Sequence, residues 1–264
     1  MFRFCSSLNS VDISNLQTYN VNNMDYMFYK CDNLTSIDLT NLNNFNVESM
    51  VGTFMNCYSL KYLNLSNFYY KNVTSFSFMF HNCLSLTSLN LNFIHADFDT
   101  KLKYINNMIS GCENMISINL SELELSNVQN MESIFSGCNS LTYVNYSNVT
   151  KNDIAYMNSL FSRCSSLTSV NFDSFNTEKV INMSNMFYNC SSLSYLNLNS
   201  FHTSQVKYMD EMFYGCSNLV NLYIFNFVQD SLLSYNNMFK YVKNSITIHA
   251  NNEFYQNLSN LVMN

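Results

Sequence analysis

Nine cysteines are the residues of this chain whose type and spacing could support chemistry. They stand at positions 5, 31, 57, 83, 112, 138, 164, 190 and 216, which are 26 residues apart except for one interval of 29. Thiols at a regular spacing are open to three uses: metal binding, disulfide formation, and burial as small apolar side chains. The fixed period also indicates that one supersecondary unit is copied end to end, as in solenoid proteins.

The spacing of the cysteines favours burial over the other two uses. Zinc sites need clustered thiolates, as in Cys-x-x-Cys, and no such pair occurs. Disulfides need Cβ atoms about 3.8 Å apart, whereas side chains in one phase of a repeat point the same way, and nine is an odd number. We therefore expect buried, unpaired thiols at a tight corner and no metal.

The first half of each unit predicts a short strand. Counted from the cysteine, apolar residues recur at offsets 3, 6 and 8, which in one unit are Leu167, Val170 and Phe172. Offsets 6 and 8 are two residues apart with polar neighbours, the alternation of a strand that buries one face. Ile246 and Ile248 predict a last strand.

The second half of each unit predicts a helix of about two turns. Its apolar residues follow spacings of 3, 3, 1 and 3, as in Val180, Met183, Met186, Phe187 and Cys190. Such residues share one stripe of a helix. Asn72 is typical of the expected N-caps. Asn or Gly precedes the cysteine in six units, as at Asn189 and Gly215, and predicts a left-handed C-cap.

Stacked units of this kind predict one α/β solenoid over residues 1–264. Strands stack about 4.8 Å apart and helices about 8–10 Å apart. The rod should therefore curve, with strands on the concave side and helices on the convex side. Residues 1–248 would form the repeats and 249–264 a C-terminal cap, in which Phe254, Leu258, Leu261 and Val262 share a helical face.

The consensus resembles that of a known family. The run Cys-x-x-Leu-x-x-Leu-x-Leu-x-x-Phe, followed by Val-x-x-Met-x-x-Met-Phe, is similar to the 26-residue repeat of BspA-type leucine-rich repeat proteins, and 164–187 and 190–213 match it closely. The resemblance covers about residues 1–248. It implies a right-handed leucine-rich repeat solenoid, a cell-surface or secreted location, and a role in adhesion and partner binding, with no catalytic residues to carry over.

Charge and hydropathy restrict the partners. Charged residues make up 11% of the chain, the net charge is −6 and no basic run occurs, so we expect no nucleic-acid binding, which needs Lys and Arg. The sequence contains no stretch of about 20 apolar residues, so it predicts no membrane span. The N-terminus lacks the features of a signal peptide, although Met1 already lies in the phase of the repeat. The four histidines share no phase, so we expect no cofactor.

The outward positions of the strands are candidates for binding. Offsets 5, 7 and 9 should line a polar, nearly uncharged concave groove that carries several aromatic rings, which are favoured at interfaces. The candidate binding residues are Tyr62, Tyr143, Tyr195, Tyr223 and Phe225. An alternative is that sheet propensity alone selected these residues, and another is that the tail covers the last two.

These features predict a non-enzymatic surface module that binds protein or glycan through its concave face. An intracellular scaffold or adaptor built on the same solenoid is the alternative.

Overall fold

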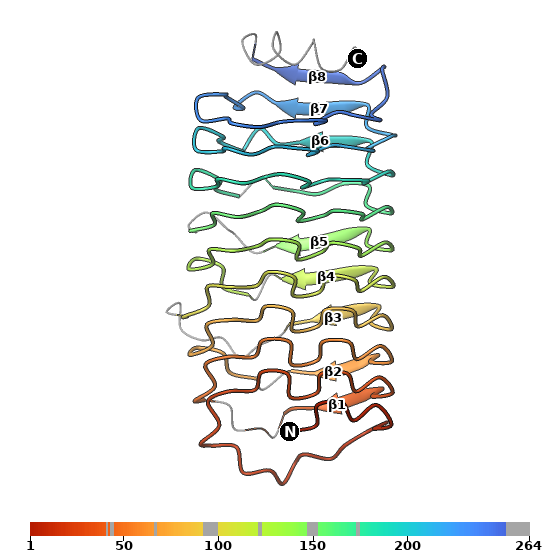
Figure 1. The fold of residues 1–264 in the computed structure, drawn as a ribbon, viewed down its shortest axis with the longest axis vertical. Coiled ribbons are helices and arrows are strands. Elements are labelled where there is room, and N and C mark those ends of the chain that lie inside the picture. The colour runs from red at the N-terminus through yellow and green to blue at the C-terminus, as the bar shows by residue number, and fades with distance from the viewer. Residues whose placement is uncertain are drawn as a thin grey trace.

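The computed structural model describes residues 1–40, 42, 45–65, 68–91, 100–120, 123–146, 153–172 and 175–251. The chain forms a parallel β-solenoid whose coils stack in a column, with the N-terminal coil at one end and the last strand near the other (Figure 1). We name each coil by its cysteine. The strands of the described residues are β1 (Ser36–Asp38), β2 (Tyr62–Asn64), β3 (Ser88–Asn90), β4 (Ser117–Leu120), β5 (Tyr143–Tyr146), β6 (Tyr195–Asn197), β7 (Asn221–Ile224) and β8 (Thr247–Ala250).

The strands that form stand where the apolar alternation predicts them, and they pair in the register of the repeat. The prediction of a strand in every unit is wrong for two units, because the described residues around Val11 and around Val170 carry none. They form three parallel sheets, β1-β2, β3-β4-β5 and β6-β7-β8. Ile37 pairs with Leu63, and Leu89 pairs with Ile118 across the 29-residue interval. The three extra residues therefore leave the pairing unchanged.

The predicted helices are wrong, because the described residues contain none. The segment before each cysteine is instead a series of turns with two left-handed residues, such as Asn185 (φ 58°) and Asn189 (φ 55°). A left-handed residue in the middle of the segment stops a right-handed helix. The residue before the cysteine does have the predicted positive φ, but it belongs to a turn and not to a helix C-cap.

The backbone of this turn segment bonds in two directions. The N–H groups of Met186 and Tyr188 donate within the coil, to the third residue back, at 3.3 and 3.1 Å. Those of Asn185 and Phe187 donate to the next coil, at 2.8 and 2.9 Å. Both sides of the solenoid are thus joined by ladders between coils, and the unequal spacing that predicted a curved rod does not exist.

The core is one continuous apolar cluster that extends from Ile13 to Phe239. Rings at the third position before the cysteines stack almost parallel, for example Phe161 on Phe187 and Phe187 on Phe213, with centroids 5.8 Å apart in both pairs. Ile109 takes this position before Cys112 and interrupts the stack. The cysteines lie beside this column as free thiols, and all are buried except Cys5 in the N-terminal coil. The prediction of buried, unpaired thiols is confirmed for these eight.

The predicted C-terminal cap falls largely outside the described residues, which end at residue 251. No helix in the described part of the chain is long and apolar enough to cross a membrane.

Candidate functional site

The outward side chains of the strands form the candidate site, which we call the strand face. A strand alternates its side chains, so Leu63 points into the core while the residues on either side of it point outward. Tyr62, Tyr143 and Tyr195 begin β2, β5 and β6 respectively, and all three side chains are exposed. Their role in binding stays a prediction.

Three aromatic rings come together on the last three strands. The ring centroids of Tyr195 and Tyr223 are 5.5 Å apart, and those of Tyr223 and His249 are 4.1 Å apart with an interplanar angle of 7°. Phe225 follows β7 directly and is exposed, and its N–H donates to Asn199 Oδ1 at 3.0 Å. We call Tyr195, Tyr223 and His249 the β6–β8 aromatic cluster, and Phe225 lies beside it at the end of β7.

The structure does not bring Tyr62 and Tyr143 into this cluster. Tyr62 and Tyr143 lie three coils apart, which is about 14 Å at the usual strand spacing. Tyr143 is two further coils from Tyr195. Each of these two rings is therefore an isolated outward group on the strand face, and the contiguous part of the predicted site is its C-terminal end.

His249 belongs to the cluster although the sequence analysis did not include it. Val242 takes the place of a cysteine, with its N–H donating to the oxygen of Phe239 at 3.1 Å as the cysteines do. Counting seven residues on from Val242 gives His249, at the offset of Tyr223, and the two residues pair in register. The signal was available in the sequence, because Ile246 and Ile248 predict this strand and His249 is its next outward position. Nε2 of His249 is buried and has no hydrogen-bond partner among the described residues.

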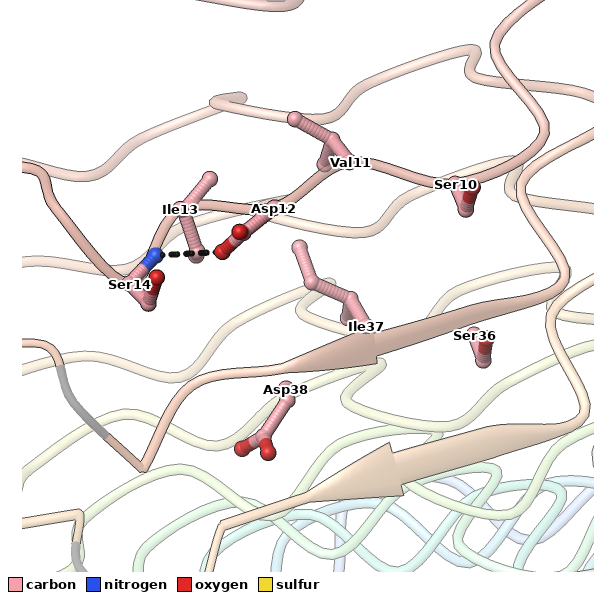
Figure 2. A pocket seen from close by; sticks show the side chains of 8 residues that line it. All are labelled: Ser10, Val11, Asp12, Ile13, Ser14, Ser36, Ile37 and Asp38. Atoms are coloured by element: carbon pink, nitrogen blue, oxygen red, sulfur yellow. Dashed lines mark hydrogen bonds between the residues drawn. The ribbon is translucent and has the colours of Figure 1, made fainter.

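The N-terminal end of the strand face carries acidic groups around a small pocket. The pocket, of about 360 Å3, lies between residues 10–14 and β1, with Asp12 and Asp38 on its two walls (Figure 2). Asp12 accepts the N–H of Ser14 at 2.9 Å, which lowers the pKa of its carboxyl group. Asp38 accepts the N–H of Thr40 at 2.9 Å. Each carboxylate thus stabilises a turn in its own coil by accepting the N–H group two residues further on.

The thiols are poor candidates for chemistry. Burial raises the pKa of Cys57 and Cys112 to about 12, and a thiol that stays protonated is a weak nucleophile and a weak metal ligand. The described residues contain no group of three or more His, Cys, Asp or Glu side chains placed to hold a metal ion. The strand face is therefore suited to contact with a partner, through aromatic surface at one end and polar side chains between the rings.

The fold and this face place the chain among repeat proteins that are built as parallel β-solenoids. The chain belongs to the family described as "Mycoplasma protein of unknown function, DUF285", whose family model matches residues 1–101, 87–153 and 143–254. No curated protein matches the sequence.

Solved structures similar to this chain include leucine-rich repeat proteins of bacteria. A leucine-rich repeat protein from Bacteroides ovatus shares 17% identity, over 82% of this chain and 70% of that one, with a TM-score of 0.25. A leucine rich cell surface protein from Faecalibacterium prausnitzii shares 16%, over 97% and 76%, at 0.29. An internalin from Listeria monocytogenes shares 13%, over 93% and 87%, at 0.30. At TM-scores of this size, none of these likenesses transfers a function.

Proposed function

We propose that this chain is a non-enzymatic interaction module that binds a protein partner through its strand face. The observation that supports this most is the β6–β8 aromatic cluster, in which Tyr195, Tyr223 and His249 lie ring to ring over three adjacent strands. Aromatic side chains supply large contact area at low entropic cost, and clustered ones anchor interfaces. The polar, nearly uncharged surroundings suit a protein or a glycan better than a nucleic acid.

We further propose that the module acts in adhesion at the cell surface. The resemblance of its repeat to that of BspA-type surface proteins supports this location. Protease added to intact cells that carry the gene should cleave the chain. Full protection until the cells are lysed would favour the intracellular scaffold instead.

The binding proposal is tested by comparing clustered and isolated rings on the same face. The chain, with a photo-crosslinking amino acid at position 225, is exposed to envelope proteins and separately to a glycan array. The variant Tyr195→Ser/Tyr223→Ser should lose the protein adduct, while Tyr62→Ser, five coils away, should keep it. The proposal fails if the double variant retains the adduct, or if no protein adduct forms and the chain instead binds the array in a way that the double variant abolishes.

A further inference from the structure

A second ladder crosses the coils half a turn away from the strands, and all of its residues except the buried Ser75 are at least partly exposed. It consists of isolated parallel bridges at the eighth residue before each cysteine, which join Asn23, Ser49, Ser75, Tyr104, Asn130, Tyr156, Asn182, Tyr208 and Ser234 in sequence. This position lies 13 residues after the start of the strand, half of the 26-residue period, except after β3, where the three extra residues make it 16. The core therefore separates this ladder from the strand face.

Tyrosines occupy every second step in the middle of this ladder. Tyr104, Tyr156 and Tyr208 are 43%, 41% and 40% exposed. Two coils separate each from the next, which is about 9.6 Å at a strand spacing of about 4.8 Å. The rings are thus too far apart to stack on one another, and each presents its surface separately at a fixed interval along the column.

An asparagine stands between each pair of tyrosines with its side chain held in one orientation. Oδ1 of Asn130 accepts the N–H of Glu132 at 2.8 Å, and Oδ1 of Asn182 accepts the N–H of Ser184 at 2.9 Å. These bonds use the amide oxygen. The NH2 group of each asparagine has no partner among the described residues, so it is left as a donor beside the rings.

We propose that this tyrosine ladder, made of Tyr104, Asn130, Tyr156, Asn182 and Tyr208, binds an extended, uncharged β-linked polysaccharide along the column. In such a chain alternate sugars present the same face, so the disaccharide repeat matches the two-coil interval. The C–H groups of a pyranose ring pack on the electron-rich face of an aromatic ring. The hydroxyl groups of the intervening sugars accept from Asn130 and Asn182.

The composition of the ladder favours this ligand over two other polymers. A protein interface has a contiguous, densely packed apolar centre, whereas these rings are separated by polar side chains. A nucleic acid needs cations along its backbone, and the exposed lysines next to the rings are Lys103 and Lys207, at the two ends of the tyrosine series. An uncharged polymer is the complement of a row that is aromatic, polar and nearly uncharged along its length.

The test compares two tyrosines of one coil that point to opposite sides. Titration calorimetry with cello- and chito-oligosaccharides of two and five units should show at least tenfold tighter binding of one of the pentamers, which reaches more than one ring. Tyr156→Ala should weaken pentamer binding by about tenfold, equivalent to about 1.4 kcal/mol. Tyr143→Ala, at the same coil on the strand face, should leave it unchanged.

Three other outcomes would contradict the proposal that the tyrosine ladder binds a polysaccharide. No heat with either pentamer at millimolar concentration, equal loss in both variants, or preference for single-stranded oligo-dT over the saccharides overturns it. Thermal melting of each variant identifies a misfolded one, in which case Tyr156→Leu replaces Tyr156→Ala and the same comparison is made. Because the protein partner is measured through Tyr195 and Tyr223, failure of the ladder leaves the proposed function standing, and the reverse also holds.

Discussion

The Sγ of Cys57 donates to the main-chain oxygen of Phe28 in the preceding coil, at 3.1 Å. The same oxygen accepts the N–H of Cys31 at 3.1 Å. The relationship recurs along the column and ends with Cys216 and the oxygen of Phe187, at 3.0 Å. Each buried thiol therefore serves as a hydrogen-bond donor between coils, and this role requires that it keep its proton.

Alkaline pH should destabilise the solenoid. Burial raises the pKa of Cys57, Cys112 and Cys216 to about 12, whereas an unfolded thiol titrates near about 8.5. Because the folded pKa is the higher one, this contribution is complete below about pH 8.5 and is lost as the pH rises toward about 12. Each thiol contributes up to about 1.4 kcal/mol per pH unit in that window.

Urea denaturation measured at several pH values checks this expectation. The free energy of unfolding should fall from about pH 8.5 upward. Tyrosines and lysines titrate in an overlapping range, so the control is Cys112→Ala, which should lower the slope of stability against pH. Identical slopes for the variant and the parent chain between pH 8.5 and 10.5 would contradict the thiol mechanism.

Two glycines in the same place of the repeat should differ in their tolerance of alanine. Gly215 and Gly137 both precede a cysteine and have φ of 69° and 76°. A Cβ on Gly215 would lie 2.0 Å from Oδ1 of Asn189, whereas one on Gly137 would meet only the backbone of Gly111, at 3.6 Å. Gly137→Ala therefore carries the left-handed strain, about 1–2 kcal/mol, and Gly215→Ala adds a clash to it.

Thermal melting of the two variants separates strain from crowding. Gly215→Ala should have the lower melting temperature, and removal of the neighbour in Gly215→Ala/Asn189→Ala should restore part of the difference. Equal losses in the two single variants would show that the contact with Asn189 costs nothing.

The aromatic column should be sensitive to the loss of a single ring. Phe187 stacks between Phe161 and Phe213, and it is fully buried. Phe187→Ala removes both contacts and leaves a cavity, so we expect a loss of about 3–5 kcal/mol in the free energy of unfolding. The matched control is Tyr188→Ala, which takes away a ring stacked on Tyr214 at 4.8 Å outside the core and should cost less than about 1.5 kcal/mol. Similar losses in both would show that the column is not what stabilises the coils.

The sequence predicts the inside of this fold better than its outside. The positions of Leu63, Leu196 and the cysteines follow from which side chains must be buried, because burial depends on residue type at a given phase. The contiguous aromatic cluster depends instead on the pairing of Tyr223 with His249, in a coil whose cysteine is replaced by Val242. The binding role of that cluster can be observed only when a partner is bound.

The turn segment was mistaken for a helix because both bury the same pattern. Met183, Met186, Phe187 and Cys190 point inward in the turns, as they would on one helical stripe. What differs is the backbone, in which half of the N–H groups bond to the next coil. The apolar periodicity contains no information on the hydrogen bonds between coils. An asparagine is compatible with a helix interior, so the residue type alone does not reveal the positive φ of Asn185.

Substitutions at Asn185 distinguish the two backbones by the sign of their effect. In a helix, Asn185→Ala would stabilise the chain and Asn185→Gly would destabilise it, since Ala has the highest helix propensity and Gly one of the lowest. At a φ of 58° the order reverses, because alanine meets a left-handed penalty of about 1–2 kcal/mol that glycine avoids. We therefore expect Asn185→Gly to unfold at a higher urea concentration than Asn185→Ala. The opposite order would support a helix in this segment and contradict the hydrogen-bond ladder between coils on this side of the solenoid.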